Sequence, residues 1–563
     1  MAEDFMTAAV KRVEAQFEKS GVSENCAAFE RKENQIEMRD GVKLHTIYYF
    51  PKEDTAEEKT YPVILTRTCY PGNDRIHRAY GEGLARRGYV YVYQYCRGRE
   101  NSEGKWEPNI NERKDGIDTM NYLVEQPWCE ILGYWGHSYT SMTGWAFADA
   151  AEGKVAAMFL EDYGTDRFTS AYEKGCFRHD ILTTWSMENA EKPVNADYRE
   201  SCRYLPQIEV DEALWGQRVP SYREYITSPN PDAALWQTGW WKQLREIPSK
   251  TKVPIYLLSG WYDHHHGSSM KTWERLNAET KQHSWLEIGA WNHFFQICLE
   301  GKEVMHPQNE EIPKMLEWFE LTLKQKEIPT QRIRAYEIGA DRWMDTVSDG
   351  LGEKGTAGSM TLYLDEKTLR TDTPEQEKTR NYTFDPATPV ESIGGEALLH
   401  TMPQIGSHLQ PEPDYREDVL SFVSEPLEET FTLNGKASVR LFVESDCEDT
   451  AFTAKIMEVT PEGKAYNIRS SIATLEQGKT EAGTYEPGSV AEVQITMWNI
   501  VYTILKGSRI RVDVSSSDFP QYHVHSNQKG LWSEKTENKI AHQTIHTGGV
   551  HASCVILPLM KKQ

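Results

Sequence analysis

ILGYWGHSYTSMTGW, residues 131–145, passes from a strand pattern to a helix pattern at a single serine. The run ILGYWG has the length and apolar character of a buried strand, and small residues follow Ser138 as in a closely packed helix. Gly136, two residues before the serine, permits the sharp turn that exposes a serine Oγ at the carboxyl edge of a sheet. Thr140 and Ser141 stand where a second small residue is usual, so we expect a crowded turn. This context predicts that Ser138 is a nucleophile.

An acid and a histidine follow Ser138 at the ends of later strand patterns. Asp263 ends VPIYLLSGWYD, and His293 ends LEIGAWNH. Folds with this turn place the nucleophile, the acid and the histidine in that chain order. His293 would take the proton of Ser138, while Asp263 would fix the imidazole tautomer and stabilise its cation. Alone, Asp263 could be a helix N-cap and His293 a polar core residue. All three at strand ends, in the right order, predict a catalytic triad.

Strand and helix patterns alternate on both sides of the serine. YPVILTRT at 61–68, YVYVYQY at 89–95 and VAAMFLE at 155–161 are typical of buried strands, with helical patterns between them. Such alternation predicts a parallel sheet covered on both faces by helices. Residues 35–52 alternate apolar and polar residues around Asp40-Gly41, which predicts a hairpin. The core is therefore expected to have an α/β-hydrolase fold.

Two changes of pattern divide the rest of the chain. Residues 162–248 are aromatic, irregular and rich in turns, which predicts an inserted helical cap over the site. Short alternating runs after Met344 predict an all-β sandwich or jelly roll of the galactose-binding-like type. The expected organisation is an N-terminal helix at 1–30, core segments at 31–161 and 249–344, the cap at 162–248, and the β-domain at 345–563.

Composition and charge exclude several partners. The chain has 62 Lys and Arg against 85 Asp and Glu, a net charge of −23, which disfavours nucleic acid and anionic membranes. The N-terminal segment is acidic and amphipathic, unlike a secretory signal, and no run has the apolar length of a membrane helix. Nine cysteines are scattered without metal-ligand or redox spacing, so we expect reduced thiols and a cytoplasmic protein.

Eight segments of the chain are distinctive: TRTCY (66–70), QYCRGRENSEG (94–104), DGIDTMNYLVEQPW (115–128), GHSYTSMTGW (136–145), SGWYD (259–263), IGAWNH (288–293), DPATPVESIGG (385–395) and LKGSRIRVDVSSSDFPQY (505–522). In these segments the chain resembles the family of cocaine esterase and the X-Pro dipeptidyl-peptidase-type serine hydrolases, often called CocE/NonD. The resemblance extends from about residue 35 to the C-terminus.

The resemblance implies an oxyanion hole. In this family the tyrosine that ends the TRTxY block and the backbone N–H after the serine donate to the oxyanion, which implies roles for Tyr70 and Tyr139. The family usually has glycine at the position of Ser141, in keeping with the crowded turn expected there.

Histidines replace acids next to the expected catalytic aspartate. Relatives specialised for α-amino acid esters carry acidic residues there to hold the substrate ammonium group, whereas this chain has His265 and His266. A protonated imidazole would favour acidic or neutral acyl groups instead. Consecutive side chains of the His264-His265-His266 run diverge, so we predict no metal site, and no cofactor is expected. The candidate residues of the substrate pocket are His137, Trp261, His265 and His266.

These features predict a serine hydrolase that cleaves carboxylic ester, or amide, bonds of small molecules through an acyl-enzyme on Ser138. The alternatives are an X-Pro dipeptidyl-peptidase-type peptidase or an acylase. Peptide cleavage is less favoured because no anionic anchor for a substrate N-terminus can be identified. A non-catalytic binding protein on the same scaffold would be expected to lack a triad member. The resemblance also implies that the chain can form a homo-oligomer, whereas the natural acyl group depends on the divergent cap.

Overall fold

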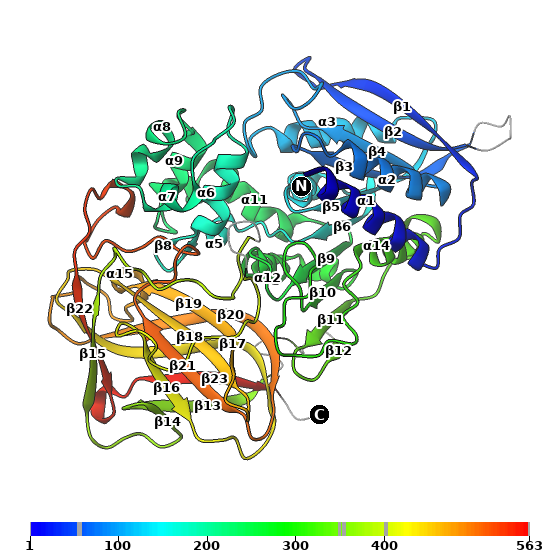
Figure 1. Cartoon of the computed structure of the whole chain (residues 1–563). Coiled ribbons are helices and arrows are strands. Elements are labelled where there is room, and N and C mark those ends of the chain that lie inside the picture. Colours follow the sequence, from blue (N-terminus) through cyan, green and yellow to red (C-terminus); the bar gives the residue numbers. More distant parts are fainter. Residues whose placement is uncertain (1, 53–58, 347–350, 352–355, 399–403, 561–563) are drawn as a thin grey trace.

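An α/β domain, an inserted group of helices and an all-β domain make up the chain (Figure 1). The computed structural model describes residues 2–52, 59–346, 351, 356–398 and 404–560. The described chain begins with helix α1 (Ala2–Lys19) and ends with strand β23 (Cys554–Met560). The predicted combination of an α/β core with a C-terminal all-β domain is confirmed.

A ten-stranded sheet forms the core of the α/β domain. Its central strands, from β4 to β11, are parallel, and the two strands at one edge and the last strand at the other are antiparallel. The predicted hairpin at the first edge is present, with Ile36 opposite Leu44 and a turn at Gly41, whose φ is +83°. In spatial order the strands are β1 (Ala28–Glu37), β2 (Lys43–Lys52), β4 (Val90–Tyr95), β3 (Tyr61–Thr68), β5 (Cys129–His137), β6 (Val155–Glu161), β9 (Ile255–Gly260), β10 (Trp285–Gly289), β11 (Arg332–Glu337) and β12 (Arg342–Thr346).

Both faces of the central strands are buried, because successive strand residues point to opposite sides and both sets are mostly apolar. In β3, Ile64 packs with α1, α2 (Asp74–Arg86) and α14 (Glu311–Phe319). Val63 and Leu65 belong to the core on the other face, which includes α3 (Glu112–Val124), α4 (Tyr139–Trp145) and α11 (Gly239–Lys250). The continuous apolar runs in the sequence reflect this two-sided burial.

The segment between β6 and β9 holds seven α-helices, one 3₁₀ helix (Gln207–Glu209) and a short two-stranded sheet. Its sequence starts where β6 ends, at the predicted boundary after residue 161, whereas the predicted boundary after residue 248 falls inside α11. The elements are α5 (Arg167–Ala171), β7 (Tyr172–Glu173), β8 (Cys176–Phe177), α6 (His179–Glu188), α7 (Tyr198–Arg203), α8 (Val210–Ala213), α9 (Pro220–Ile226), α10 (Ala234–Gln237) and α11.

The C-terminal domain is built on an eleven-stranded sheet. All its pairings are antiparallel except that of β14 with β16. The all-β prediction is confirmed, and the name jelly roll stays a prediction. The strands are β13 (Thr356–Asp365), β14 (Thr368–Arg370), β15 (Lys378–Phe384), β16 (Leu420–Ser424), β17 (Phe431–Ser445), β18 (Ala451–Val459), β19 (Ala465–Thr474), β20 (Ala491–Ile504), β21 (Arg509–Ser515), β22 (Ala541–Thr547) and β23.

A buried arginine ties the β-domain to the loop that follows β9. Arg469, on β19, donates hydrogen bonds to the carbonyl oxygens of Trp261 at 2.7 Å and Asn499 at 2.6 Å, and it forms an ion pair with Glu396. A buried guanidinium needs acceptors, and Nη1 and Nη2 of Arg469 find them on both domains, so this contact restricts how the two domains pack. The β-domain thereby supports the backbone just before Asp263.

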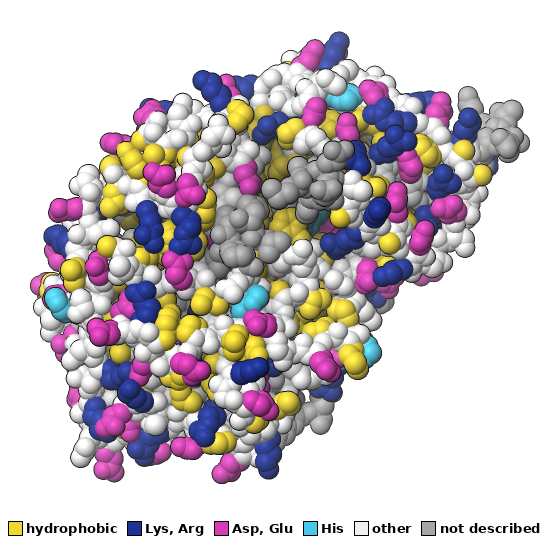
Figure 2. Space-filling view, viewed as in Figure 1, with side chains coloured by type: hydrophobic (Ala, Val, Ile, Leu, Met, Phe, Trp, Pro, Cys, Tyr) yellow, Lys and Arg dark blue, Asp and Glu magenta, His cyan; other side chains and the backbone are white. Residues whose placement is uncertain are grey.

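Charges are mixed on the face shown in Figure 2, where Lys and Arg side chains are interspersed with Asp and Glu. The net charge of −23 is therefore distributed rather than gathered in one patch of this face. Among the described residues, no helix is both long enough and apolar enough to cross a bilayer.

Candidate active site

The turn between β5 and α4 holds Ser138 in a strained conformation. Its φ of +57° lies in the left-handed region, and its backbone N–H bonds the carbonyl of Glu161 on the neighbouring strand at 3.0 Å. A Cβ at Gly136 would lie 2.2 Å from the carbonyl oxygen of Thr140, so only glycine fits there. The structure thus shows why the sharp turn needs a glycine at position 136, as predicted. The turn presents the Ser138 hydroxyl beyond the end of β5.

Thr140 fits into the turn that we expected to be crowded. Its Oγ1 accepts a hydrogen bond from the His137 N–H at 2.7 Å and donates one to the His137 carbonyl, also at 2.7 Å. The side chain thus binds the backbone on the other side of Ser138. Thr140 therefore stabilises the turn through these two hydrogen bonds and does not crowd it.

The three predicted triad residues lie together. His293 Nε2 is 2.9 Å from Ser138 Oγ, and His293 Nδ1 is 2.5 Å from Asp263 Oδ2. The other carboxylate oxygen of Asp263 accepts the backbone N–H of His265 at 2.7 Å. Asp263 is fully buried and follows β9, while His293 follows β10. This chain of hydrogen bonds can move a proton from a serine to an imidazole that a carboxylate orients.

The Tyr70 phenol lies beside the serine. Tyr70 follows β3, and its backbone N–H donates a hydrogen bond to Thr68 Oγ1 at 3.1 Å. Burial raises the pKa of the phenol above its usual value, and a hydrogen bond with Ser138 opposes the rise only in part. The phenol also accepts a long hydrogen bond, 3.5 Å, from the indole N–H of Trp185 on α6. A protonated phenol next to Ser138 can donate to an oxygen bound there.

Tyr139 offers its backbone rather than its side chain. Its phenol donates to Glu112 Oε1 at 3.0 Å and accepts the backbone N–H of Asn109 at 2.9 Å. Its ring stacks on Trp185, with centroids 5.8 Å apart. The backbone N–H of Tyr139 begins α4, where no intrahelical acceptor is available, so it can serve the predicted oxyanion hole.

Sequence reasoning missed Trp185 and Asp162. Trp185 lies among many aromatic residues of the insertion, so no signal marked it. Asp162 directly follows β6, which is the same strand-end signal that identifies Asp263, but the change of pattern at residue 162 places it at the start of the predicted cap.

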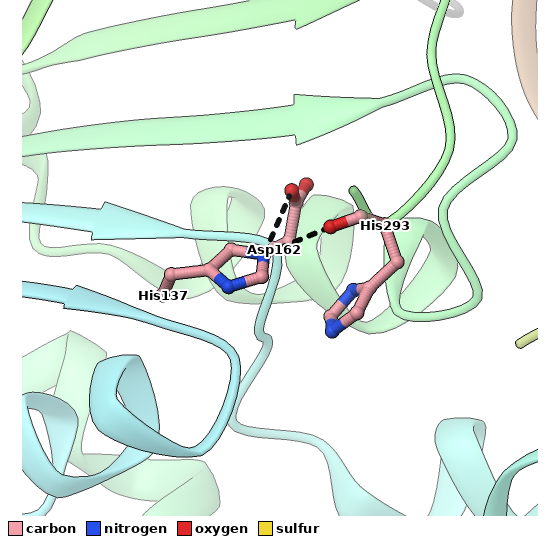
Figure 3. Close-up of side chains that lie close together, drawn as sticks. All are labelled: His137, Asp162 and His293. Atoms are coloured by element: carbon pink, nitrogen blue, oxygen red, sulfur yellow. Dashed lines mark hydrogen bonds and ion pairs between the residues drawn. The ribbon is translucent and has the colours of Figure 1, made fainter. Parts of the chain in front are cut away.

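His137 and Asp162 lie close to the triad histidine (Figure 3). His137 Nε2 donates to the carbonyl oxygen of His293 at 2.9 Å and lies 3.6 Å from Asp162 Oδ2. Asp162 is fully buried with a φ of +49°, and burial together with the Asp263 charge raises its pKa well above the usual range. His137 therefore supports the His293 loop, whereas its predicted contact with substrate stays a prediction.

Burial changes the interpretation of the histidine run. His265 bonds Ser170 Oγ at 2.9 Å, and His266 bonds Ser259 Oγ at 3.3 Å and the Asn499 carbonyl of the β-domain at 3.2 Å. Burial, joined by nearby positive charges, lowers the pKa of both imidazoles well below 6.5. The expectation that a protonated His265 or His266 attracts acidic acyl groups is therefore wrong, because both stay neutral.

Two other predicted neighbours of the site are buried. Trp261 is 1% exposed, and its indole N–H donates to the carbonyl oxygen of Tyr336 at 2.8 Å, so it packs in the core instead of facing substrate. His264 lies with its ring 4.2 Å from that of His293, measured between centroids. It packs against the triad histidine.

Two groups around His293 have the spacing of metal ligands. Their nitrogen and oxygen atoms lie within 4.8 Å of one another. Both groups use His293, whose ring nitrogens already bond Ser138 and Asp263, so a metal there would compete with the triad. The groups are His137, Asp162 and His293, and Asp263, His264 and His293.

The fold and this arrangement define a serine hydrolase on an α/β-hydrolase core. The sequence profile of the X-Pro dipeptidyl-peptidase (S15 family) matches residues 40–295, and that of the X-Pro dipeptidyl-peptidase C-terminal non-catalytic domain matches residues 329–556. The chain is 27% identical to cocaine esterase from Rhodococcus sp. over 576 residues, which cover 94% of this chain and 98% of the esterase. The chain belongs to this family of cocaine esterase and X-Pro dipeptidyl-peptidase-like hydrolases.

Solved structures share the whole architecture. An α-amino acid ester hydrolase superposes with a TM-score of 0.81 at 21% identity, covering 95% of this chain and 97% of its own. An aminopeptidase from a Thaumarchaeota archaeon superposes with a TM-score of 0.79 at 20% identity, covering 95% and 96%. These similarities extend over both domains and establish the fold.

Proposed function

We propose that the protein hydrolyses carboxylic esters of small molecules through an acyl-enzyme on Ser138. The observation that carries this proposal is the continuous chain of hydrogen bonds from Ser138 Oγ through His293 to Asp263. The similarity to cocaine esterase over nearly the full length of both chains supports an ester as the substrate class.

In the acylation step, Ser138 Oγ attacks the ester carbonyl carbon while its proton passes to His293 Nε2. Asp263 stabilises the imidazolium through its hydrogen bond to Nδ1. The carbonyl oxygen becomes an oxyanion that accepts from the Tyr70 phenol and the Tyr139 backbone N–H. When the carbonyl re-forms, the alkoxide leaves with the proton held by His293.

Water completes the cycle in the deacylation step. His293 removes a proton from a water molecule, whose oxygen attacks the acyl carbon bound to Ser138. The resulting oxyanion uses the same two donors as before. Collapse releases the carboxylic acid and returns the proton to Ser138 Oγ, so the enzyme ends in its starting state.

We expect neutral acyl groups to be preferred to charged ones. The neutral imidazoles of His265 and His266 provide no charge for an acidic acyl group. Tyr70, which interacts with Ser138, belongs to a cluster of aromatic side chains with Tyr139, Trp185 and Trp106. Glu188, on the same helix as Trp185, is near enough to help raise the Tyr70 pKa and is the carboxylate to test with α-amino esters.

The localisation and assembly are also part of the proposal. None of the nine cysteines forms a disulfide in the described part of the chain, which supports a reducing compartment such as the cytoplasm. We propose that the chain acts on a small molecule and forms a homo-oligomer as the family resemblance implies.

A panel of substrates tests the proposed reaction. Purified protein should be assayed with butyryl, glutaryl and α-aminobutyryl esters, a lactone, a β-lactam and an X-Pro anilide, with Ser138→Ala as the matched control. We expect the highest kcat/KM for the butyryl ester and no turnover by Ser138→Ala above background. The highest kcat/KM for the X-Pro anilide would instead assign a dipeptidyl-peptidase, the function suggested by the S15 profile. Equal turnover by Ser138→Ala would refute the proposal.

A further inference from the structure

Strands β15 and β22 lie side by side at one edge of the β-domain (Figure 1). Two histidines and a glutamate converge there. Glu377 immediately precedes β15, His546 lies in β22, and His551 ends the short helix η6 (Gly549–His551). We propose that these three side chains bind one divalent transition-metal ion, with Zn²⁺ as the best-suited metal. This site is separate from the proposed hydrolytic site and does not depend on its function.

The spacing of the three side chains fits a tetrahedral ion. Zn²⁺ binds imidazole nitrogen and carboxylate oxygen at about 2.0–2.2 Å, which places neighbouring ligand atoms about 3.3 Å apart. Glu377 Oε1 lies 3.2 Å from His546 Nδ1 and 2.7 Å from His551 Nδ1. All three ligand atoms lie within 4.8 Å of one another. Because the residues come from three chain segments, their ligand atoms converge as those of consecutive histidines do not.

A second carboxylate orients one of the ligands. His546 Nε2 lies 2.8 Å from Glu444 Oε1 on β17, so the imidazole is held from its far side while Nδ1 faces Glu377. Metal-bound histidines usually donate their other ring N–H to a carboxylate, which fixes the tautomer and makes the ligand nitrogen more basic. The carboxylates of Glu377 and Glu444 also supply negative charge that attracts a cation.

The backbone holds the cluster in place before any ion binds. Gly548 has a φ of +75°, and a Cβ there would lie 2.2 Å from the carbonyl oxygen of Gln376. The N–H of Gly549 bonds the Pro374 carbonyl at 2.8 Å. Glycine therefore permits the turn that carries His551 to pack against the segment just before β15, which carries Glu377. The segments need little rearrangement to bind a metal.

The site is also accessible. The side chain of His546 is 8% exposed, whereas those of Glu377 and His551 are 40% and 31% exposed. An ion can reach the two exposed ligands from solvent, and a water molecule can fill the fourth tetrahedral position. A site with this shape fits a stabilising ion that ties β22 and the η6 turn to the start of β15.

The competing explanation is a pair of protonated histidines neutralised by Glu377 and Glu444. The two explanations predict opposite effects of pH. Metal ligands must be deprotonated, so binding should weaken as the pH falls below about 6.5, the reference pKa of histidine. Charged histidine pairs would instead strengthen over the same range and would need no metal.

The test is calorimetric titration of the chelator-stripped, full-length protein with Zn²⁺ at pH 7.5 and pH 5.5, together with thermal unfolding with and without Zn²⁺. The variants are His551→Gln, Glu377→Gln and Glu444→Gln. The matched control is His542→Gln, because His542 lies on the same strand and pairs with a single carboxylate, Asp446, at 2.7 Å.

We expect one Zn²⁺ per chain, a higher Tm with Zn²⁺, and binding at least tenfold weaker at pH 5.5. Glu444→Gln should weaken binding about 10–100-fold, and His551→Gln and Glu377→Gln should weaken it at least as much. His542→Gln should bind like the parent protein. Hydrolysis should continue in the metal-loaded protein, since this ion does not occupy His293. Unchanged affinity in His551→Gln and Glu377→Gln, or no binding by the parent protein, would overturn the proposal.

Discussion

Replacing Tyr70 by phenylalanine removes one of the two proposed oxyanion donors while keeping the ring. The ring packs edge-on against Tyr139, with centroids 6.2 Å apart, and this contact survives in Tyr70→Phe. The hydrogen bond lost to Trp185 is long, 3.5 Å, so its loss should change stability little. The main loss is a buried donor that acts on charge formed in the transition state. Such a loss lowers kcat by about 10²–10³, or about 2.7–4 kcal/mol of barrier.

Steady-state kinetics on a butyryl ester would measure this effect in kcat and KM separately. We expect KM to stay nearly constant, because the phenol acts mainly on the oxyanion and only weakly on the bound ester. Tyr163→Phe is a suitable control, since Tyr163 is another buried phenol near the site but packs against His265. A raised KM with an unchanged kcat in Tyr70→Phe would refute the reasoning and assign Tyr70 to substrate binding.

Three further perturbations test other parts of the site and fold. Gly136→Ala would place a Cβ 2.2 Å from the Thr140 carbonyl, so urea unfolding should show a loss of about 1–3 kcal/mol along with reduced activity; parent-like stability would contradict the reading of the turn. Asp263→Asn should lower kcat by about 10⁴, measured with the same ester, because it favours the wrong tautomer of the triad imidazole, and a loss below tenfold would argue against this role. Burial lowers the pKa of His77 and His179 to about 3. Between about pH 6.5 and pH 3 the unfolded chain therefore binds more protons than the folded chain, so the free energy of unfolding decreases as the pH is lowered through that window. Each should cost about 2 kcal/mol between pH 7 and pH 5, and denaturant unfolding of His179→Gln should show a smaller acid-induced loss; an unchanged loss would contradict this account.

The triad could be predicted from the sequence because each member has a local signal. Ser138 follows a strand and precedes a helix, and Asp263 and His293 end later strands in the expected chain order. The ends of parallel strands meet at one edge of a sheet, so local patterns were enough to place distant residues together. Tyr70 has no such signal, and its candidate role came only from the family resemblance.

The surroundings of the triad could not be predicted, because they depend on contacts between distant segments. The pKa of His266 is lowered first by burial and then by the charge of Arg469, which comes from the distant β-domain. Trp185 reaches Tyr70 from an insertion in which aromatic residues are common. Asp162 ends β6, but its burial behind His137 depends on how the His293 loop folds back. The periodicity of a sequence indicates which face of a helix or strand is apolar. It does not indicate which distant segments pack against the polar residues at the ends of that helix or strand.

Covalent labelling of Ser138 tests the central claim most directly. The purified protein should be treated with a fluorophosphonate and analysed by intact mass spectrometry and peptide mapping, with Ser138→Ala treated in parallel. The account predicts one adduct per chain on Ser138, none on Ser138→Ala, and a loss of ester turnover in that variant of about 10⁶, as in other triads. An adduct on a different residue, or full turnover by Ser138→Ala, would contradict it.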